Sequence, residues 1–186
     1  MKRHLPYFLA VLAVISSSAF AAADASKPDP LAKVAWLQGH WAGVGEGEPG
    51  TSATERHIQC ALSCRYLRVD GRSVYPRQEK NAKGEIHQSM DMWSFDRKRG
   101  KLVLRTFDNL GFTTTYVEDA EAGNETTLVM IAEHLENVPT GWQARYTYTF
   151  APPNEYRELL ELDPNGKGFQ TYVSNRFLRV EDKESR

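Results

Sequence analysis

The sequence predicts an all-β protein: an antiparallel up-and-down barrel of about ten strands, preceded by a short N-terminal helix. Many short segments alternate between apolar and polar residues with a period of two, which is typical of half-buried strands. The clearest is 143–150, where Ala144, Tyr146 and Tyr148 share one face. Turn-forming residues separate these segments, and each tight link implies an antiparallel neighbour. The length allows one domain with a sizeable core.

Residues 1–23 have the composition of a secretory signal peptide. Two basic residues are followed by the largely apolar run 5–15 and by small residues at Ala19 and Ala21. An uncleaved anchor is the alternative, but the run is about half of the roughly 20 apolar residues that span a bilayer. We therefore expect cleavage between Ala21 and Ala25 and a periplasmic or secreted product without a membrane anchor.

The remaining chain divides into a disordered lead-in, residues 24–30, and a barrel domain, residues 31–182. The whole sequence has 23 Lys and Arg against 24 Asp and Glu, and removal of Lys2 and Arg3 with the signal peptide makes the mature chain more acidic. This balance offers nothing that attracts nucleic acid or an anionic membrane. We expect neither as a partner.

The two cysteines, Cys60 and Cys64, are expected to form a disulfide in an oxidising compartment. A tight turn at residues 61–63 would bring them to a separation that a disulfide can bridge. The loop is small, so the entropic gain is small as well. A redox or metal-binding pair is the alternative, but three residues separate the cysteines where a thioredoxin-type motif has two.

The expected elements follow in order along the chain. Residues 31–37 carry apolar positions at helical spacing, enough for one or two turns. The turn signals include Asp70-Gly71 and the Pro-Asn-Gly run at 164–166. Strand patterns occupy residues 41–47, 54–62, 65–69, 75–80, 85–95, 101–107, 112–118, 126–134, 143–150, 156–162 and 169–180.

Closure into a barrel is expected because a meander of this size would otherwise leave two exposed sheet edges. A two-sheet sandwich is the alternative, since hairpin spacing does not exclude Greek-key connections.

Alternation in the first strand places Trp41, Gly43, Gly45 and Gly47 on one face. In a barrel, this face would close one end with the tryptophan and leave space beyond it for a ligand or another backbone. Alternatively, the glycines only permit the sharp coiling of a barrel strand.

The string Trp-Leu-x-Gly-x-Trp-x-Gly-x-Gly-x-Gly at 36–47 resembles the first strand of known barrels. Its Gly-x-Trp after a short helix is similar to the lipocalin and calycin barrels. The longer string resembles nitrobindin-like haem-binding barrels and uncharacterised bacterial lipocalin-like proteins. The resemblance implies a lipocalin-like barrel in which Trp41 packs against a basic side chain of the last strand, Arg176 or Arg179. We assign structural roles to Trp41 and Arg176.

The nitrobindin resemblance also implies a histidine ligand for haem iron near the C-terminal strand, but residues 169–180 contain none. Of the remaining histidines, His134 follows Leu128 and Met130 on an apolar face and is the one candidate. His87 lies on the face opposite Met90. We therefore expect no cofactor, with haem as the alternative.

The aromatic residues are numerous enough to fill a core and also line a lumen. No nucleophile elbow, zinc-binding His-Glu-x-x-His or phosphate loop occurs, so we assign no catalytic or metal-binding residue. The candidate ligand-binding residues are Gly43, Gly45, Tyr116, His134, Tyr146 and Tyr148.

These observations predict an exported barrel that binds a small, mostly apolar molecule without converting it. Two alternatives stay open. One is a nitrobindin-like haem protein acting on nitrogen oxides, and the other is an envelope interaction module with a packed core. Fold resemblance alone does not separate them.

Overall fold

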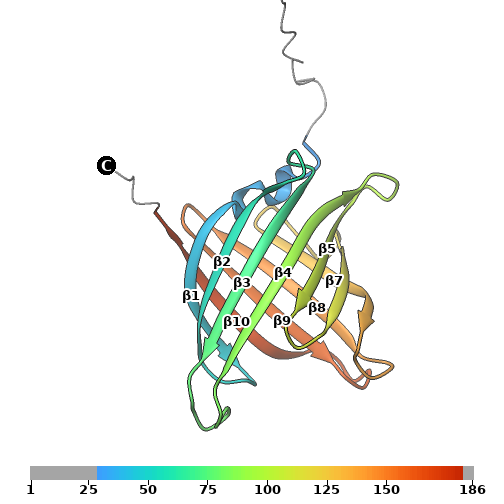
Figure 1. Cartoon of the computed structure of the whole chain (residues 1–186). Helices are drawn as coiled ribbons and strands as arrows, with labels where there is room; N and C mark the ends of the chain where they lie inside the picture. Colours follow the sequence, from blue (N-terminus) through green and yellow to red (C-terminus); the bar gives the residue numbers. More distant parts are fainter. Residues whose placement is uncertain (1–28, 182–186) are drawn as a thin grey trace, which may run out of the picture.

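The computed structural model describes residues 29–181. The signal peptide predicted at residues 1–23 and most of the predicted lead-in lie outside the described residues, and both stay predictions. The described part forms one short helix and ten strands (Figure 1). No helix between residues 29 and 181 has the length and apolarity required to span a membrane.

The strands form a closed antiparallel barrel in up-and-down order. Each strand pairs with its neighbours in sequence, and β1 pairs with β10 to close the ring. The predicted all-β barrel is confirmed, and the two-sheet sandwich is wrong because every strand is paired on both sides. The strands are β1 (Gly39–Gly47), β2 (Ser52–Ala61), β3 (Tyr66–Tyr75), β4 (Glu85–Asp96), β5 (Lys101–Asp108), β6 (Thr113–Glu118), β7 (Thr127–Glu136), β8 (Gln143–Ala151), β9 (Glu155–Asp163) and β10 (Gln170–Val180).

β3 continues through the Asp70-Gly71 pair that the sequence predicted as a turn. Gly71 faces the barrel interior, where a side chain would crowd Ser89 Oγ and the side chain of Arg56. The glycine is therefore needed for space and does not reverse the chain. The strand expected at 75–80 is also wrong, because β3 ends at Tyr75 and a loop leads to β4.

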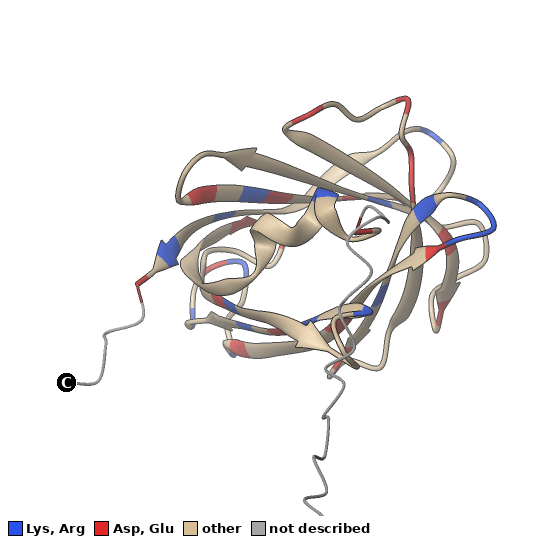
Figure 2. Ribbon diagram, turned by 90° about the horizontal axis from the view of Figure 1, so that it is seen from above, with Lys and Arg blue, Asp and Glu red and all other residues tan. Residues whose placement is uncertain are grey.

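A two-turn 3₁₀ helix, η1 (Ala32–Leu37), lies across one end of the barrel (Figure 2). Its own residues Val34 and Leu37 are fully buried. The indole nitrogen of Trp41 donates to the Leu37 carbonyl at 2.7 Å, and the Trp36 ring stacks on Phe150 with centroids 4.5 Å apart. The helix and Trp41 together close this end of the barrel. The alternation of Trp41 with the glycines of the first strand predicted this position for the tryptophan.

Arg179 is the basic residue that packs against Trp41. Its guanidinium carbon lies 4.0 Å from the centre of the Trp41 ring, and Nη2 donates to the Trp36 carbonyl at 2.8 Å. Arg176 points to the outer surface, where it forms an ion pair with Glu155 at 2.6 Å. The packing against Trp41 expected of Arg176 is therefore wrong. Residues three apart in a strand lie on opposite faces, so Arg176 and Arg179 cannot both reach the tryptophan.

Gly43 and Gly45 lie on the inner face of β1, but neither is among the residues that line the cavity described below. A side chain on Gly43 would collide with the backbone carbonyl of Arg176, so this glycine permits the close approach of β10. A side chain on Gly45 would collide with the buried side chains of Asn175 and Ser52. The ligand contact expected of the two glycines is not found. They make room for β10 and for polar side chains instead.

The half of the barrel next to η1 is a packed apolar core. Burial of this much apolar surface is the main source of stability for a barrel of this size. Its fully buried members include Leu37, Trp41, Leu67, Trp93, Leu102, Leu104, Met130, Tyr156 and Phe177.

The predicted disulfide between Cys60 and Cys64 is confirmed. It closes the loop between β2 and β3, where Leu62, Ser63 and Cys64 all adopt positive φ angles near 55°. L-residues rarely adopt this left-handed conformation, so the covalent link holds a turn that the local sequence does not favour.

Candidate functional site

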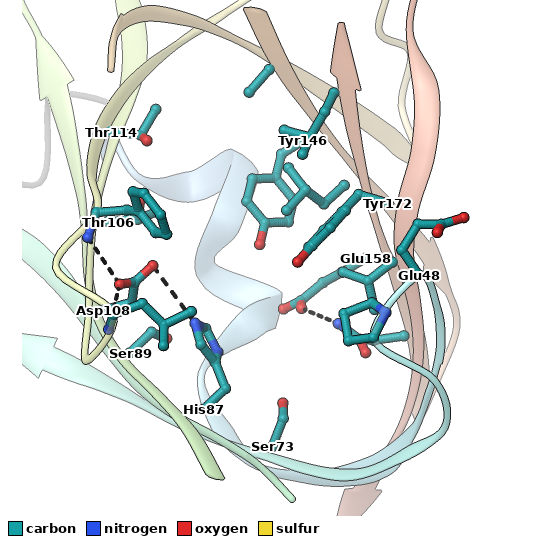
Figure 3. Close-up of a pocket in the computed structure, with 18 of the residues that line it drawn as sticks. Glu48, Ser73, His87, Ser89, Thr106, Asp108, Thr114, Tyr146, Glu158 and Tyr172 are labelled. Carbon is teal, nitrogen blue, oxygen red and sulfur yellow. Dashed lines mark hydrogen bonds and ion pairs between the residues drawn. The ribbon is translucent and has the colours of Figure 1, made fainter. Parts of the chain in front are cut away.

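The half of the barrel away from η1 contains a cavity of about 520 Å³. It opens between the hairpin loops that join β1 to β2, β5 to β6, β7 to β8 and β9 to β10. In Figure 3 the helix lies behind the lining side chains, at the closed end. The rim is formed by Glu48, Pro49, Leu110, Phe112, Val138, Trp142 and Pro164.

A buried ion pair marks the place where the cavity meets the apolar core. Arg56 of β2 and Glu158 of β9 lie 3.0 Å apart, and the Arg56 guanidinium also lies 5.0 Å above the Phe177 ring. Tyr156 and Asn175 donate to Glu158 at 3.2 and 3.3 Å. Burial is the largest influence on Arg56 and disfavours its charge, but the Glu158 carboxylate, together with Tyr156, Tyr146 and Asp91, outweighs burial and raises the pKa of Arg56. The Arg56 guanidinium therefore stays charged inside the barrel.

Asp91 of β4 is a second acidic group on the cavity lining. Burial is the largest influence on this carboxyl and raises its pKa to about 7. Arg56 opposes the shift, and Glu158 adds to it. Ser89 Oγ donates to Oδ2 at 3.4 Å, while Oδ1 has no hydrogen-bond partner among the described residues. The group can therefore exchange a proton near neutral pH, and it carries a free acceptor.

Three of the predicted ligand-binding residues, Tyr116, Tyr146 and Tyr148, line one wall of the cavity. Tyr116 and Tyr146 meet edge to face at 5.3 Å, and Tyr146 stacks on Tyr148 at 5.5 Å. Burial raises the pKa of each hydroxyl above its ordinary value, so the phenols stay neutral. They give the cavity apolar ring surface with polar tips.

The mouth carries a second polar pair. His87 Nε2 lies 3.6 Å from Asp108 Oδ2, and Figure 3 shows the two side chains directed toward each other. The other Asp108 oxygen accepts from the backbone amides of Leu110 and Phe112 at 2.9 and 3.0 Å. These bonds fix the β5–β6 hairpin and hold the carboxylate beside the imidazole.

His134, the remaining predicted ligand-binding residue, lies outside the barrel. Its side chain is 68% exposed and lies 3.8 Å from Glu136. The register between β6 and β7 shifts at Thr115 and Tyr116, so β7 contains one extra residue before His134. This bulge reverses the alternation that places Met130 inside, and Leu135 lines the cavity instead.

The residues of the cavity do not fit haem. Among the described residues, His87 is the one histidine on the lining, and its Nε2 faces Asp108. The deep end holds the ion pair of Arg56 and Glu158, where a haem site would place apolar side chains against the macrocycle. No group of three or more potential metal ligands occurs between residues 29 and 181.

Comparisons with known proteins identify the fold only. No family model matches the sequence, and no curated protein matches it. The structure is similar to that of Rv2717c from M. tuberculosis, with a TM-score of 0.61 and 16% sequence identity over 83% of this chain and 99% of that chain. A second similar structure, EF1p2_mFAP2b bound to DFHBI, has a TM-score of 0.39 and 13% identity over 78% of this chain and 94% of that one. The first likeness supports the closed barrel, and neither assigns a function.

Most of the polar lining could not be recognised from the sequence pattern. Along β4, His87 lies on the face opposite the apolar Met90, yet His87, Ser89 and Asp91 face the cavity. Met90 lies on the outer surface and is 41% exposed. The sequence does contain a signal for this orientation. His87 and Trp93 are six residues apart in β4, so they lie on the same face of the strand, and Trp93 is fully buried inside the barrel.

Proposed function

We propose that this protein is an exported binding barrel that holds a small molecule in its lumen without converting it. The cavity of about 520 Å³ is the observation that carries this proposal. Small-molecule sites are typically concave spaces of about 300–1,000 Å³ with apolar walls and a few convergent polar groups. The tyrosine wall and the Arg56, Asp91 and Glu158 groups match that composition.

The proposed location of the protein is the periplasm or the extracellular space. It rests on the signal-peptide pattern of residues 1–23, and the disulfide between Cys60 and Cys64 agrees with an oxidising compartment. A binding role also suits such a compartment, because it needs no nucleotide supply.

The two other hypotheses receive less support. An envelope interaction module with a packed core is disfavoured because the barrel interior contains a cavity of about 520 Å³. A nitrobindin-like haem protein is disfavoured because His134 lies on the outer surface and the deep end of the cavity is ionic. The sequence suggested a mostly apolar ligand. The polar groups on the lining favour a ligand with polar groups of its own, since a mostly apolar molecule would leave them unpaired.

Neutral Nile red is a suitable probe for a lumen with aromatic walls. The matched variants are Ser89→Trp, which puts an indole into the cavity, and Gln88→Trp, which puts the same indole on the outer face of β4. The full chain is titrated with the dye, and fluorescence enhancement is recorded.

Saturable binding with one site, weakened at least about tenfold by Ser89→Trp and unchanged by Gln88→Trp, supports a lumen site. Equal loss in both variants, or no saturable enhancement for the unmodified protein, overturns the proposal. Circular dichroism of each variant shows whether the barrel has formed.

A further inference from the structure

The lining of the cavity carries much more negative than positive charge. Arg56 is its one cationic side chain of the Lys or Arg type, and His87 is its one imidazole among the described residues. Five carboxyl groups reach the cavity from β4, β5, β9 and the loop after β1: Glu48, Glu85, Asp91, Asp108 and Glu158. Low-dielectric walls strengthen the field of such an excess.

The positive charge of Arg56 is already matched within the protein. Its Nη2 donates to Glu158 at 3.0 Å, and Nη1 donates to Thr54 Oγ1 and to the Glu55 carbonyl, both at 2.9 Å. An anionic ligand would have to compete with the Glu158 carboxylate for this guanidinium while lying close to Asp91. The site is therefore poorly suited to a carboxylate or phosphate.

Two oxygen acceptors on the lining receive no hydrogen bond from any residue between 29 and 181. Asp91 Oδ1 is buried and unpaired, and so is Asn175 Oδ1, whose residue is 4% exposed. The Asn175 amide nitrogen donates to Glu158, which fixes the orientation of its unpaired oxygen. That oxygen occupies the place where a side chain on Gly45 would enter the lumen. An unpaired buried acceptor is costly, and a ligand that donates hydrogen bonds would remove the cost.

The aromatic wall favours the same kind of ligand. The rings of Tyr116, Tyr146 and Tyr148 present π surface to the cavity, and Trp142 and Tyr172 extend this surface to the mouth. An ammonium group near such rings is attracted by their quadrupoles, and an aromatic or aliphatic body packs against them.

We propose that the natural ligand of the cavity is an organic amine, with its ammonium group beside Asp91 and its apolar body against the tyrosine wall. This inference rests on the proposed binding function and specifies the chemical class of the ligand. The ammonium supplies both the positive charge and the hydrogen-bond donors that the lining lacks.

Three compounds that share an indole body test the proposal: tryptamine, tryptophol and indole-3-acetate carry a cation, a hydroxyl and an anion. Their dissociation constants for the full chain are measured by Nile red displacement and by isothermal titration calorimetry at pH 8. Tryptamine is expected to bind at least about tenfold more tightly than tryptophol, and indole-3-acetate more weakly than either.

Asp91→Asn and Glu85→Gln each remove one carboxylate from the lining, and the tryptamine-to-tryptophol affinity ratio is the readout. Because it is a ratio, a general loss of affinity cancels. Asp91→Asn is expected to reduce the ratio to below about threefold. The control, Asp70→Asn, makes the same change on the outer face of the neighbouring β3 and is expected to leave the ratio unaltered.

The results separate this inference from the binding proposal beneath it. If Nile red binds in the lumen but tryptamine fails to displace it, or if indole-3-acetate binds most tightly, the amine inference is wrong. An affinity ratio that neither Asp91→Asn nor Glu85→Gln changes also overturns it. If Nile red itself does not bind, the proposed function fails first. Glu85→Gln supplies the readout if Asp91→Asn does not fold.

Discussion

Asp91 couples the cavity to pH. Burial raises its pKa to about 7, against the opposing charge of Arg56 and with the help of Glu158 and Asp108. An aspartate in an unfolded chain titrates near pH 3.9, so between about pH 4 and 7 the folded protein holds a proton that the unfolded chain has lost. The free energy of unfolding therefore falls as pH rises through this interval and levels off above it.

Asp91→Asn is expected to abolish this fall in stability. The difference in pKa corresponds to at most about 4 kcal/mol, so the variant should be the more stable protein at pH 8. Urea unfolding at pH 4.5, 5.5, 6.5 and 7.5 measures the slope. Asp70→Asn, on the outer face of β3, should keep the slope of the unmodified protein. The lowered pKa of Glu155, about 2, acts below this interval. An unchanged slope in Asp91→Asn would assign the pH dependence to other groups.

The limit of sequence reasoning at this scale is the direction of single side chains. Tyr146 and Tyr148 could be placed correctly because β8 alternates without interruption. His134 could not, because the bulge in β7 shifts the register just before it. Arg56 and Glu158 escaped notice because a charged residue in an alternating strand is normally assigned to the solvent face, and only the cavity reverses that expectation.

The helix η1 is held to the barrel by Arg179. This residue donates to the Trp36 carbonyl at 2.8 Å and covers the Trp41 ring at 4.0 Å. Arg176, three residues earlier in β10, makes its ion pair with Glu155 on the surface. Arg179 and Arg176 therefore lie in the same strand but on opposite faces, so a substitution at Arg176 can serve as the control for one at Arg179.

Arg179→Ala is expected to lower the free energy of unfolding by about 2–4 kcal/mol, because it removes charged hydrogen bonds and a cation–π contact. Arg176→Ala should have a much smaller effect, since exposed ion pairs contribute little. Chemical unfolding of both variants measures the two free energies of unfolding. Equal effects would show that Arg179 does not hold the helix.

The disulfide in the loop between β2 and β3 is expected to contribute little to the stability of the barrel. In the entropic model, a disulfide that closes so short a loop stabilises by about 2 kcal/mol, and release of the left-handed residues Leu62 and Ser63 offsets part of that. Reduction is therefore expected to cost less than about 2 kcal/mol. Thermal unfolding with and without dithiothreitol measures it, and the double variant Cys60→Ser/Cys64→Ser should behave as the reduced protein. A loss of folding on reduction would contradict the model.

Strand existence could be predicted well from alternation and turn residues, while strand limits could not. Asp70-Gly71 is a strong hairpin signal, yet Gly71 lies inside β3 because Arg56 and Ser89 need the space of its missing side chain. That requirement comes from strands brought together by the closed ring, so no local pattern contains it.

The two ends of the barrel differ in what they contribute to the whole molecule: one supplies stability and the other contains the cavity. The end under η1 buries Trp41, Trp93 and Phe177 and supplies stability, while the other end keeps an open cavity with ionised groups. Closure of the barrel could be predicted because an open sheet of this size would leave the backbone hydrogen-bonding groups of its two edge strands unpaired. The open half could not, because strand patterns do not distinguish a filled lumen from a lined one.

Ligand binding and pH should therefore be linked through the stability of the whole barrel. An amine beside Asp91 favours the ionised carboxylate, so its binding displaces the proton that the free protein holds below about pH 7. Tryptamine, which is cationic throughout, is expected to raise the melting temperature more at pH 8 than at pH 5.5. At a concentration of 100 times the dissociation constant, a ligand stabilises by about 2.7 kcal/mol. Tryptophol should produce the same shift at both pH values, and Asp91→Asn should remove the difference for tryptamine. A larger tryptamine shift at pH 5.5 would mean that the ligand prefers the protonated carboxyl and would place the ammonium elsewhere in the cavity.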